Sequence, residues 1–231
     1  MGFFYGFDSY YFVLVIPAIL ISLFAQIRVS SAFSKYSKVN TRITGAEAAE
    51  RLLKAEGITN VKIERVSGNL TDHFDPRKNV IRLSDNVYNS STAAAVGVAC
   101  HEAGHAVQYA QHYFPIKIRN LIVPVTRIGS YLSWPLLLFG IILNSPYLIE
   151  LGIILFGLVV VFQLITLPVE FNASVRAINA IKENSIIYDD KTLKGVKSVL
   201  SAAALTYVAA LLVSLAQMLR LILLFGGRRR R

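Results

Sequence analysis

Cysteine is almost absent from this chain of 231 residues: the sequence has one, Cys100. A single cysteine excludes an internal disulfide bond. Cys100 directly precedes His101, and consecutive side chains on a helix point in different directions. We therefore expect Cys100 to be a small, buried, apolar residue rather than part of a site.

Acidic residues are also scarce. The chain has 14 Asp and Glu against 24 Lys and Arg, so its formal net charge is +10, while 54% of its residues are hydrophobic. This composition is too apolar for an ordinary soluble domain and favours an integral membrane protein. Because the sequence has no nucleic-acid-binding motif, we assign the positive charge to cytoplasmic segments and anionic lipid, and we expect no nucleic-acid partner.

Long apolar runs carry most of the hydrophobic residues. Each is about one bilayer long and nearly free of charge, which predicts four transmembrane helices: residues 10–27, 121–143, 147–167 and 199–225. A tight turn at Asn144, Ser145 and Pro146 joins the middle two, which predicts a membrane hairpin. We expect Pro17 to kink the first run and Arg220 to snorkel toward the headgroups.

The polar sequence between the first two runs predicts a small α+β portion. Thr44 and Glu47 make a capping box for a helix that ends at Gly57. Two alternating segments, Val61–Val66 and Val80–Leu83, predict strands. We expect the second strand to lie at the edge of its sheet, where an extended peptide could pair with it.

A complete H-E-x-x-H pattern follows, in an alanine-rich segment that predicts a helix capped by Ser91 or Thr92. His101 and His105 are four residues apart, so both imidazoles lie on one helix face and can bind one zinc ion. Glu102 lies beside them, where it can take a proton from a water that the metal activates. The alternative is a chance match on an apolar helix, but two of the chain's four histidines fall in this pattern.

A catalytic zinc needs a third protein ligand. The metzincin pattern would place glycine at position 108 and histidine at position 111. This sequence has Gln108 and Gln111 there, so that class is excluded. His112 is displaced by one residue, and we interpret it as a surface histidine.

The remaining class takes a glutamate from a later helix. The acidic residues after His105 are Glu150, Glu170, Glu183, Asp189 and Asp190. If the hairpin crosses the membrane and returns, Glu150 is left on the far side, whereas Glu170 emerges beside the zinc helix. The last three lie in a polar loop, where solvated charge is the default. Glu170 is therefore the predicted third ligand.

Four segments of the sequence form a recognisable set. They are His-Glu-Ala-Gly-His-Ala-Val-Gln from His101, Leu-Pro-Val-Glu-Phe-Asn-Ala-Ser from Leu167, Asp-His-Phe-Asp-Pro from Asp72, and Ala-Ala-Leu-Thr-Tyr-Val-Ala-Ala from Ala203. Together they resemble the YugP-type family of bacterial membrane zinc metallopeptidases, and the likeness covers essentially the whole chain. The predicted fold is mainly α and integral to the membrane, with about four transmembrane helices and a small α+β zincin-like catalytic portion.

The resemblance implies one Zn2+ bound by His101, His105 and Glu170, with Glu102 as general base. The Glu-x-x-Ala pattern that starts at Glu170 is more distantly similar to the third-ligand helix of the HtpX and CAAX-prenyl proteases. Those proteases place an aspartate where this chain has Ser174. FtsH also carries His-Glu-Ala-Gly-His, but this chain has no Gly-x-x-x-x-Gly-Lys-Ser/Thr loop, so ATP-driven unfolding is not encoded.

The predicted function is peptide-bond hydrolysis by a membrane-embedded zinc endopeptidase that uses Glu102 to activate water. His73 or Tyr207 could stabilise the oxyanion. Plainer interpretations stay open for both: an Asx-type turn over residues 72–76, and a core tyrosine with a satisfied hydroxyl. The substrate would be a peptide or protein, membrane proteins included, and the oligomeric state stays open.

On this hypothesis the chain is a single membrane metallopeptidase domain. Its parts are a soluble portion with the zinc helix (28–117), the transmembrane hairpin (118–168), the third-ligand helix entered through Pro168 with its loop (169–198), and the last membrane helix with a basic tail (199–231). The alternatives are a zinc-binding membrane scaffold, an inactive protease homologue and a transporter. The intact Glu102 argues against the first two, and the low charge of the apolar runs argues against the third.

The Lys and Arg of residues 28–119 and 176–197 predict a multi-pass protein of the cell membrane with its site at the cytoplasmic face. Four spans would then place the C-terminal arginines, 228–231, outside the cell, unless the last run is re-entrant or interfacial. These arginines could bind anionic headgroups.

Overall fold

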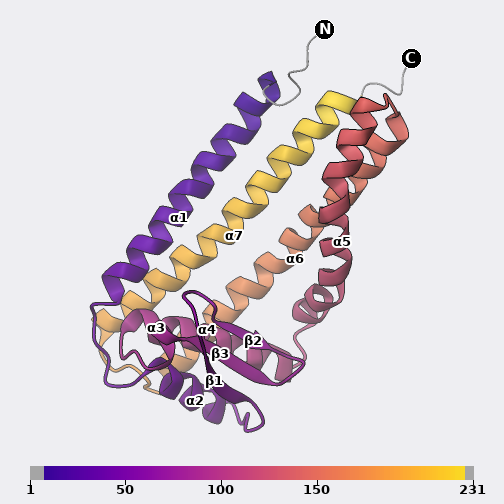
Figure 1. Cartoon of the computed structure of the whole chain (residues 1–231). Coiled ribbons are helices and arrows are strands. Elements are labelled where there is room, and N and C mark those ends of the chain that lie inside the picture. The colour runs from indigo at the N-terminus through magenta and orange to yellow at the C-terminus, as the bar shows by residue number, and fades with distance from the viewer. Residues whose placement is uncertain (1–7, 227–231) are drawn as a thin grey trace. The chain divides into compact units, whose positions relative to one another are not determined.

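The chain is mainly helical and has one small sheet. The structure is a computed structural model that describes residues 8–226, so the arginines at 228–231 lie outside the described residues. In chain order (Figure 1) the elements are η1 (Tyr11–Val15, a π-helix), α1 (Ile16–Tyr36), α2 (Gly45–Ala55), β1 (Lys62–Val66), β2 (His73–Asp75), β3 (Val80–Ser84), α3 (Asp85–Tyr88), α4 (Ala93–Ala110), α5 (Phe114–Ile142), α6 (Pro146–Glu183) and α7 (Asp190–Phe225). The prediction of a mainly α fold with a small α+β portion is confirmed.

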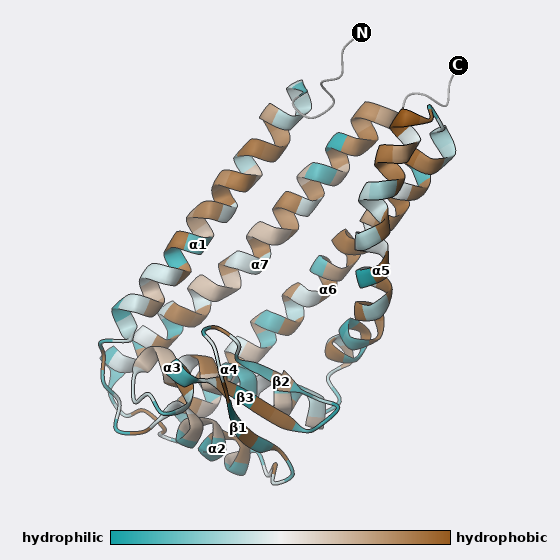
Figure 2. Ribbon diagram, in the orientation of Figure 1, coloured by the Kyte–Doolittle hydropathy of each residue, from teal (hydrophilic) through white to brown (hydrophobic). Residues whose placement is uncertain are grey.

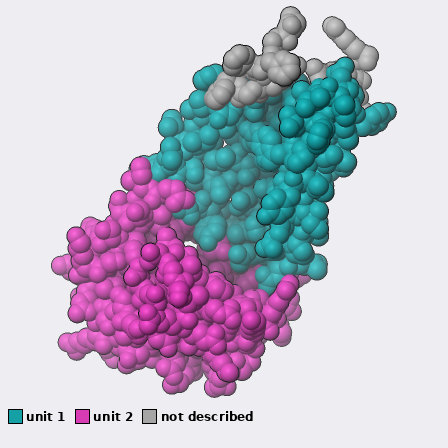
Figure 3. All heavy atoms as spheres, in the orientation of Figure 1, with its two compact units in different colours: residues 1–25, 118–167, 206–231 teal, residues 26–117, 168–205 magenta. Residues whose placement is uncertain are grey.

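Two compact units make up the fold (Figure 3). Unit 1 comprises residues 1–25, 118–167 and 206–231, and unit 2 comprises residues 26–117 and 168–205. Each unit has a hydrophobic core of its own. The core of unit 1 includes Leu137, Phe156 and Leu211, and that of unit 2 includes Leu52, Ile81 and Ile181.

Within residues 8–226, four helices are long and apolar enough to cross a membrane: η1 with α1, α5, α6 and α7. Brown, the colour of hydrophobic residues, dominates much of their length in Figure 2. The prediction of four transmembrane helices is therefore confirmed. The five-residue π-helix η1 ends two residues before Pro17. A proline clashes with the carbonyl four residues earlier, and a wider π turn relieves that clash.

We expected Arg220 to snorkel toward the headgroups, but its side chain is buried in unit 1. Its side chain donates from Nε to Oδ2 of Asp8 over 2.8 Å, and the guanidinium lies 5.1 Å from the ring centre of Tyr11. An arginine among apolar helices is stable when a counter-charge accompanies it. This ion pair ties the segment before η1 to α7.

The sheet of unit 2 has the strand order β1-β3-β2, with β1 parallel and β2 antiparallel to β3. The two predicted strands are confirmed as β1 and β3, but the expectation that the second lies at the sheet edge is wrong. Residues 73–75, which we assigned to a turn, form β2 and cover that edge. The Asx turn follows directly, since Asp75 Oδ1 accepts from the backbone N–H groups of Arg77 and Lys78.

Side chains cap the helices of unit 2 as the sequence predicts. Thr44 and Glu47 form both hydrogen bonds of the capping box on α2. Gly57 follows that helix with φ at +71°, a conformation that glycine adopts without strain. Thr92 accepts from the backbone N–H of Ala95 and caps α4.

Two predicted helix boundaries are wrong. α6 continues through Pro168 to Glu183, so residues 168–182 are the end of a long helix and not a separate one. Helices in apolar surroundings tolerate proline because neighbouring groups compensate for the lost hydrogen bond. α7 begins at Asp190 rather than near residue 199, because Asp189 accepts from the backbone and hydroxyl of Thr192 and caps the helix there.

Candidate metal centre

Helix α4 carries three of the predicted site residues through the interior of unit 2. Its small side chains leave room for neighbours on nearly every side, and most of its residues are buried. His101 and His105 stand one turn apart with ring centroids 4.7 Å apart and ring planes at 82°. Both imidazoles therefore lie on one face of the helix, as the four-residue spacing predicts.

Helix α6 passes against α4 at Gly104. A Cβ atom built on Gly104 would lie 2.6 Å from the backbone oxygen of Ala173, closer than real Cβ atoms approach. The glycine is thus required for this helix crossing. One turn before Ala173, the crossing brings Glu170 over the two histidines.

The three predicted ligands converge. Glu170 Oε2 lies 3.2 Å from His101 Nε2 and 3.5 Å from His105 Nε2. One ligand atom from each residue lies within 4.8 Å of the others. The selection of Glu170 from the later acidic residues therefore agrees with the geometry.

This donor set fits zinc. Ligand atoms about 2.0–2.1 Å from a tetrahedral zinc are about 3.3 Å from one another. The two distances between Glu170 and the histidines, 3.2 and 3.5 Å, bracket that value. Glu170 is only 2% exposed, and a buried carboxylate between two neutral imidazoles needs a positive charge.

Each histidine makes a second contact through its other ring nitrogen. Nδ1 of His101 lies 3.1 Å from the hydroxyl of Ser174, and Nδ1 of His105 lies 3.0 Å from Oε1 of Gln108. Such contacts orient imidazole ligands and leave Nε2 for the metal. Ser174 thus gives His101 a neutral hydroxyl as its partner.

Gln108 is the residue that sequence reasoning missed. We used it only to exclude the metzincin class, yet it is fully buried and contacts α6 as well as His105. Its position three residues after His105, on the same helix face, was the available signal. Gln111 is not near the ligands: it accepts a hydrogen bond from Arg176 and donates one to Glu56.

Glu102 is nearly buried, at 9% exposure, and hydrogen bonds to no other residue in the described range 8–226. It is not one of the three converging ligands. A carboxylate that is neither a ligand nor already paired can accept a proton from water. This state fits the predicted general base.

The other two predicted catalytic residues lie on other elements, β2 and α7. His73 is exposed on β2, with Nδ1 2.7 Å from the carbonyl of Thr71 and Nε2 3.4 Å from Arg82. Tyr207 belongs to α7 in unit 1. Their catalytic roles stay predictions. His112, exposed at the end of α4 with φ at +56°, lies outside the cluster as expected.

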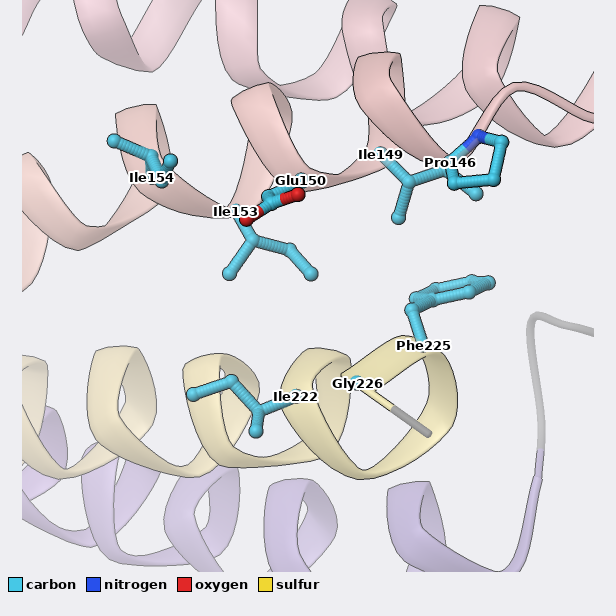
Figure 4. A pocket seen from close by; sticks show the side chains of 8 residues that line it. All are labelled: Pro146, Ile149, Glu150, Ile153, Ile154, Ile222, Phe225 and Gly226. Carbon is cyan, nitrogen blue, oxygen red and sulfur yellow. The ribbon is translucent and has the colours of Figure 1, made fainter. Parts of the chain in front are cut away.

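A pocket of about 330 Å³ lies elsewhere, in unit 1 (Figure 4). Its lining is apolar apart from the side chain of Glu150: Pro146, Ile149, Ile153, Ile154, Ile222, Phe225 and Gly226. None of the predicted site residues lines it, so we assign it no part in the chemistry.

The Gly104 crossing gives a direct test of the centre. Gly104→Ala should weaken zinc binding at least about tenfold, because the new methyl group would push Ala173 and hence Glu170 away from the histidines. Chelator competition on the purified protein measures the affinity. Gly97→Ala is the matched control on α4, since its Cβ would lie at an ordinary 3.4 Å from Val196. Equal zinc affinity in both variants would contradict the close crossing.

Comparison with known proteins identifies the family of the chain. From residue 11 to residue 226 the chain matches the family described as "Putative neutral zinc metallopeptidase". It is 49% identical over 218 residues to "Putative membrane protease YugP" of Bacillus subtilis (strain 168), which covers 93% of this chain and 96% of that protein. No solved structure matches the chain. The chain therefore belongs to the putative neutral zinc metallopeptidase family, and the resemblance seen in its motifs is confirmed.

Proposed function

We propose that this family member is a membrane-embedded, zinc-dependent endopeptidase. The observation that carries the proposal is the convergence of His101, His105 and Glu170, with an unpaired carboxylate, Glu102, next to the first of them on α4. The histidines would hold the metal through Nε2, and Glu170 would hold it through a carboxylate oxygen. The family and the relative's name, a membrane protease, support the same reaction class.

The chemistry divides between the metal and Glu102. Bound zinc would supply Lewis acidity, which polarises a carbonyl group and lowers the pKa of water. Glu102 removes the proton from the attacking water and then delivers it to the leaving amine.

We further propose that His73 and Tyr207 stabilise the developing oxyanion. His73 would have to leave its present contacts with Thr71 and Arg82 to do so. Unchanged hydrolysis in both His73→Ala and Tyr207→Phe would remove these residues from the mechanism.

The substrate would bind as an extended strand. β2 pairs with β3 on one side and, among the described residues, leaves its other edge unpaired. Phe74 of β2 contacts Tyr109, one turn after His105 on α4, with ring centroids 5.9 Å apart. The free edge of β2 is therefore available for a peptide backbone beside the helix of the metal ligands, whereas β3 is paired on both sides. Cleavage of a peptide whose backbone is N-methylated around the scissile bond would contradict this pairing.

We infer that the site faces the cytoplasm and that the anionic leaflet contacts the start of α7. Lys191, Lys194 and Lys197 are exposed there, form no ion pair within residues 8–226, and directly precede the apolar part of the helix. Six residues of helix span about 9 Å, roughly one Debye length, so all three lysines lie within electrostatic reach of headgroups.

Cysteine labelling tests this orientation. The native Cys100 is fully buried and burial raises the pKa of its thiol, so it stays unreactive. Ser145→Cys, at the hairpin tip, should react with a membrane-impermeant maleimide in intact cells. Ser67→Cys, in the β1–β2 loop, should react only after lysis. The reverse pattern would contradict both the cytoplasmic site and the lipid contact.

Glu102→Gln tests the proposed function. The variant should keep one zinc per chain and lose hydrolysis of labelled casein by at least about a hundredfold, because it removes the general base and leaves the ligands in place. Glu50→Gln, an exposed glutamate on α2, is the matched control and should cleave normally.

Retained hydrolysis in Glu102→Gln would contradict the mechanism. Wild-type protein that binds zinc but cleaves neither casein nor a peptide library would instead favour the zinc-binding scaffold or the inactive homologue.

A further inference from the structure

The buried amide of Gln108 lies between His105 and helix α6. Its Oε1 is 3.0 Å from Nδ1 of His105, and its Nε2 is 2.8 Å from the backbone oxygen of Val169 and 2.9 Å from Oδ1 of Asn172. An amide side chain can be turned by 180° in most settings, which would exchange its oxygen and nitrogen. The orientation decides which ring nitrogen of His105 carries the proton.

Two neighbouring groups fix this orientation, because one can only accept a hydrogen bond and the other can only donate one. The carbonyl of Val169 can only accept a hydrogen bond, so the NH2 group of Gln108 has to face it. Arg176 can only donate, and its Nε lies 2.7 Å from Oδ1 of Asn172. The oxygen of Asn172 is thereby set toward both Arg176 and Gln108, and it too requires the NH2 group of Gln108.

The oxygen of Gln108 therefore faces His105 and accepts from it. Nδ1 of His105 carries the proton, and Nε2 keeps its lone pair on the side of Glu170, 3.5 Å away. This is the tautomer that binds a metal through Nε2. His101 differs, because the hydroxyl of Ser174 can donate or accept and does not dictate a tautomer.

We propose that Gln108 is a positioning residue that presets His105 for the metal, held in place by Val169 and by the pair Asn172–Arg176. The inference rests on the proposed zinc centre. Gln108 joins the helix that carries His105 to the helix that carries Glu170, so one side chain sets both the tautomer of one ligand and its place relative to another. Its loss should weaken metal binding although it touches no metal.

Three substitutions separate this role from simple packing. Gln108→Leu keeps the volume and removes every hydrogen bond, so zinc affinity should fall about 10- to 100-fold. Gln108→Glu keeps an acceptor for His105 but loses both donors to α6, so it should recover affinity to within about threefold of the wild type. Gln26→Leu makes the same change at an exposed glutamine of α1, outside the Asn172–Arg176 pair, and should leave affinity unchanged.

Zinc dissociation constants from chelator competition and the visible spectrum of the Co2+-loaded protein are the readouts. The thermal midpoint of the metal-free protein reports folding separately. Wild-type affinity in Gln108→Leu would overturn the proposal. So would equal weakening in Gln108→Glu and Gln108→Leu, which would make Gln108 a bridge between helices and no more. Wild-type protein without zinc would instead overturn the proposed metal centre itself.

Discussion

The burial of the Glu170 carboxylate against two imidazoles is the constraint on which the rest of unit 2 depends. Neutral histidines do not compensate its charge, and an uncompensated buried charge costs many kcal/mol. A divalent cation at the point where His101, His105 and Glu170 converge removes that cost. The close approach of α4 and α6 at Gly104, and the Gln108 bridge beside it, hold the donors in place for it.

Local sequence patterns predicted the parts of this architecture that depend on local physics. The helix caps and the helical spacing of the two histidines depend on residues within one or two turns, and apolar runs predict spans by length alone. Glu170 needed a topological argument, because it lies 69 positions after His101 and becomes its neighbour only when the hairpin returns. The family resemblance then supported the same residue.

The failures share a physical cause. β2 has three residues, and its pairing with β3 rather than its own pattern makes it a strand. We predicted that a helix begins at Pro168, but α6 continues through this proline in its apolar surroundings. In the sequence, Gln108 was only a residue that departs from the metzincin zinc motif. Its proposed role depends on the carbonyl of Val169, and the sequence does not predict that this carbonyl lies beside it. Each of these features is decided by tertiary contacts.

The two histidines are held in different ways. Gln108, with every donor and acceptor assigned, fixes His105, whereas Ser174 gives His101 a neutral partner whose hydrogen can rotate. A charged partner would raise the basicity of the imidazole more than a hydroxyl does. In this chain the hydrogen bonds therefore fix His105, at the crossing of the two helices, more strictly than they fix His101.

The most direct test of the central claim is the zinc content of the purified wild-type protein beside Glu170→Gln. Glu183→Gln, an exposed acid at the end of the same helix, is the control. We predict about one zinc per chain in the wild type and in Glu183→Gln, and clear loss in Glu170→Gln, because the substitution removes both a ligand and the charge that balances the cation. Full zinc retention in Glu170→Gln would show that Glu170 is not a ligand and would contradict the account.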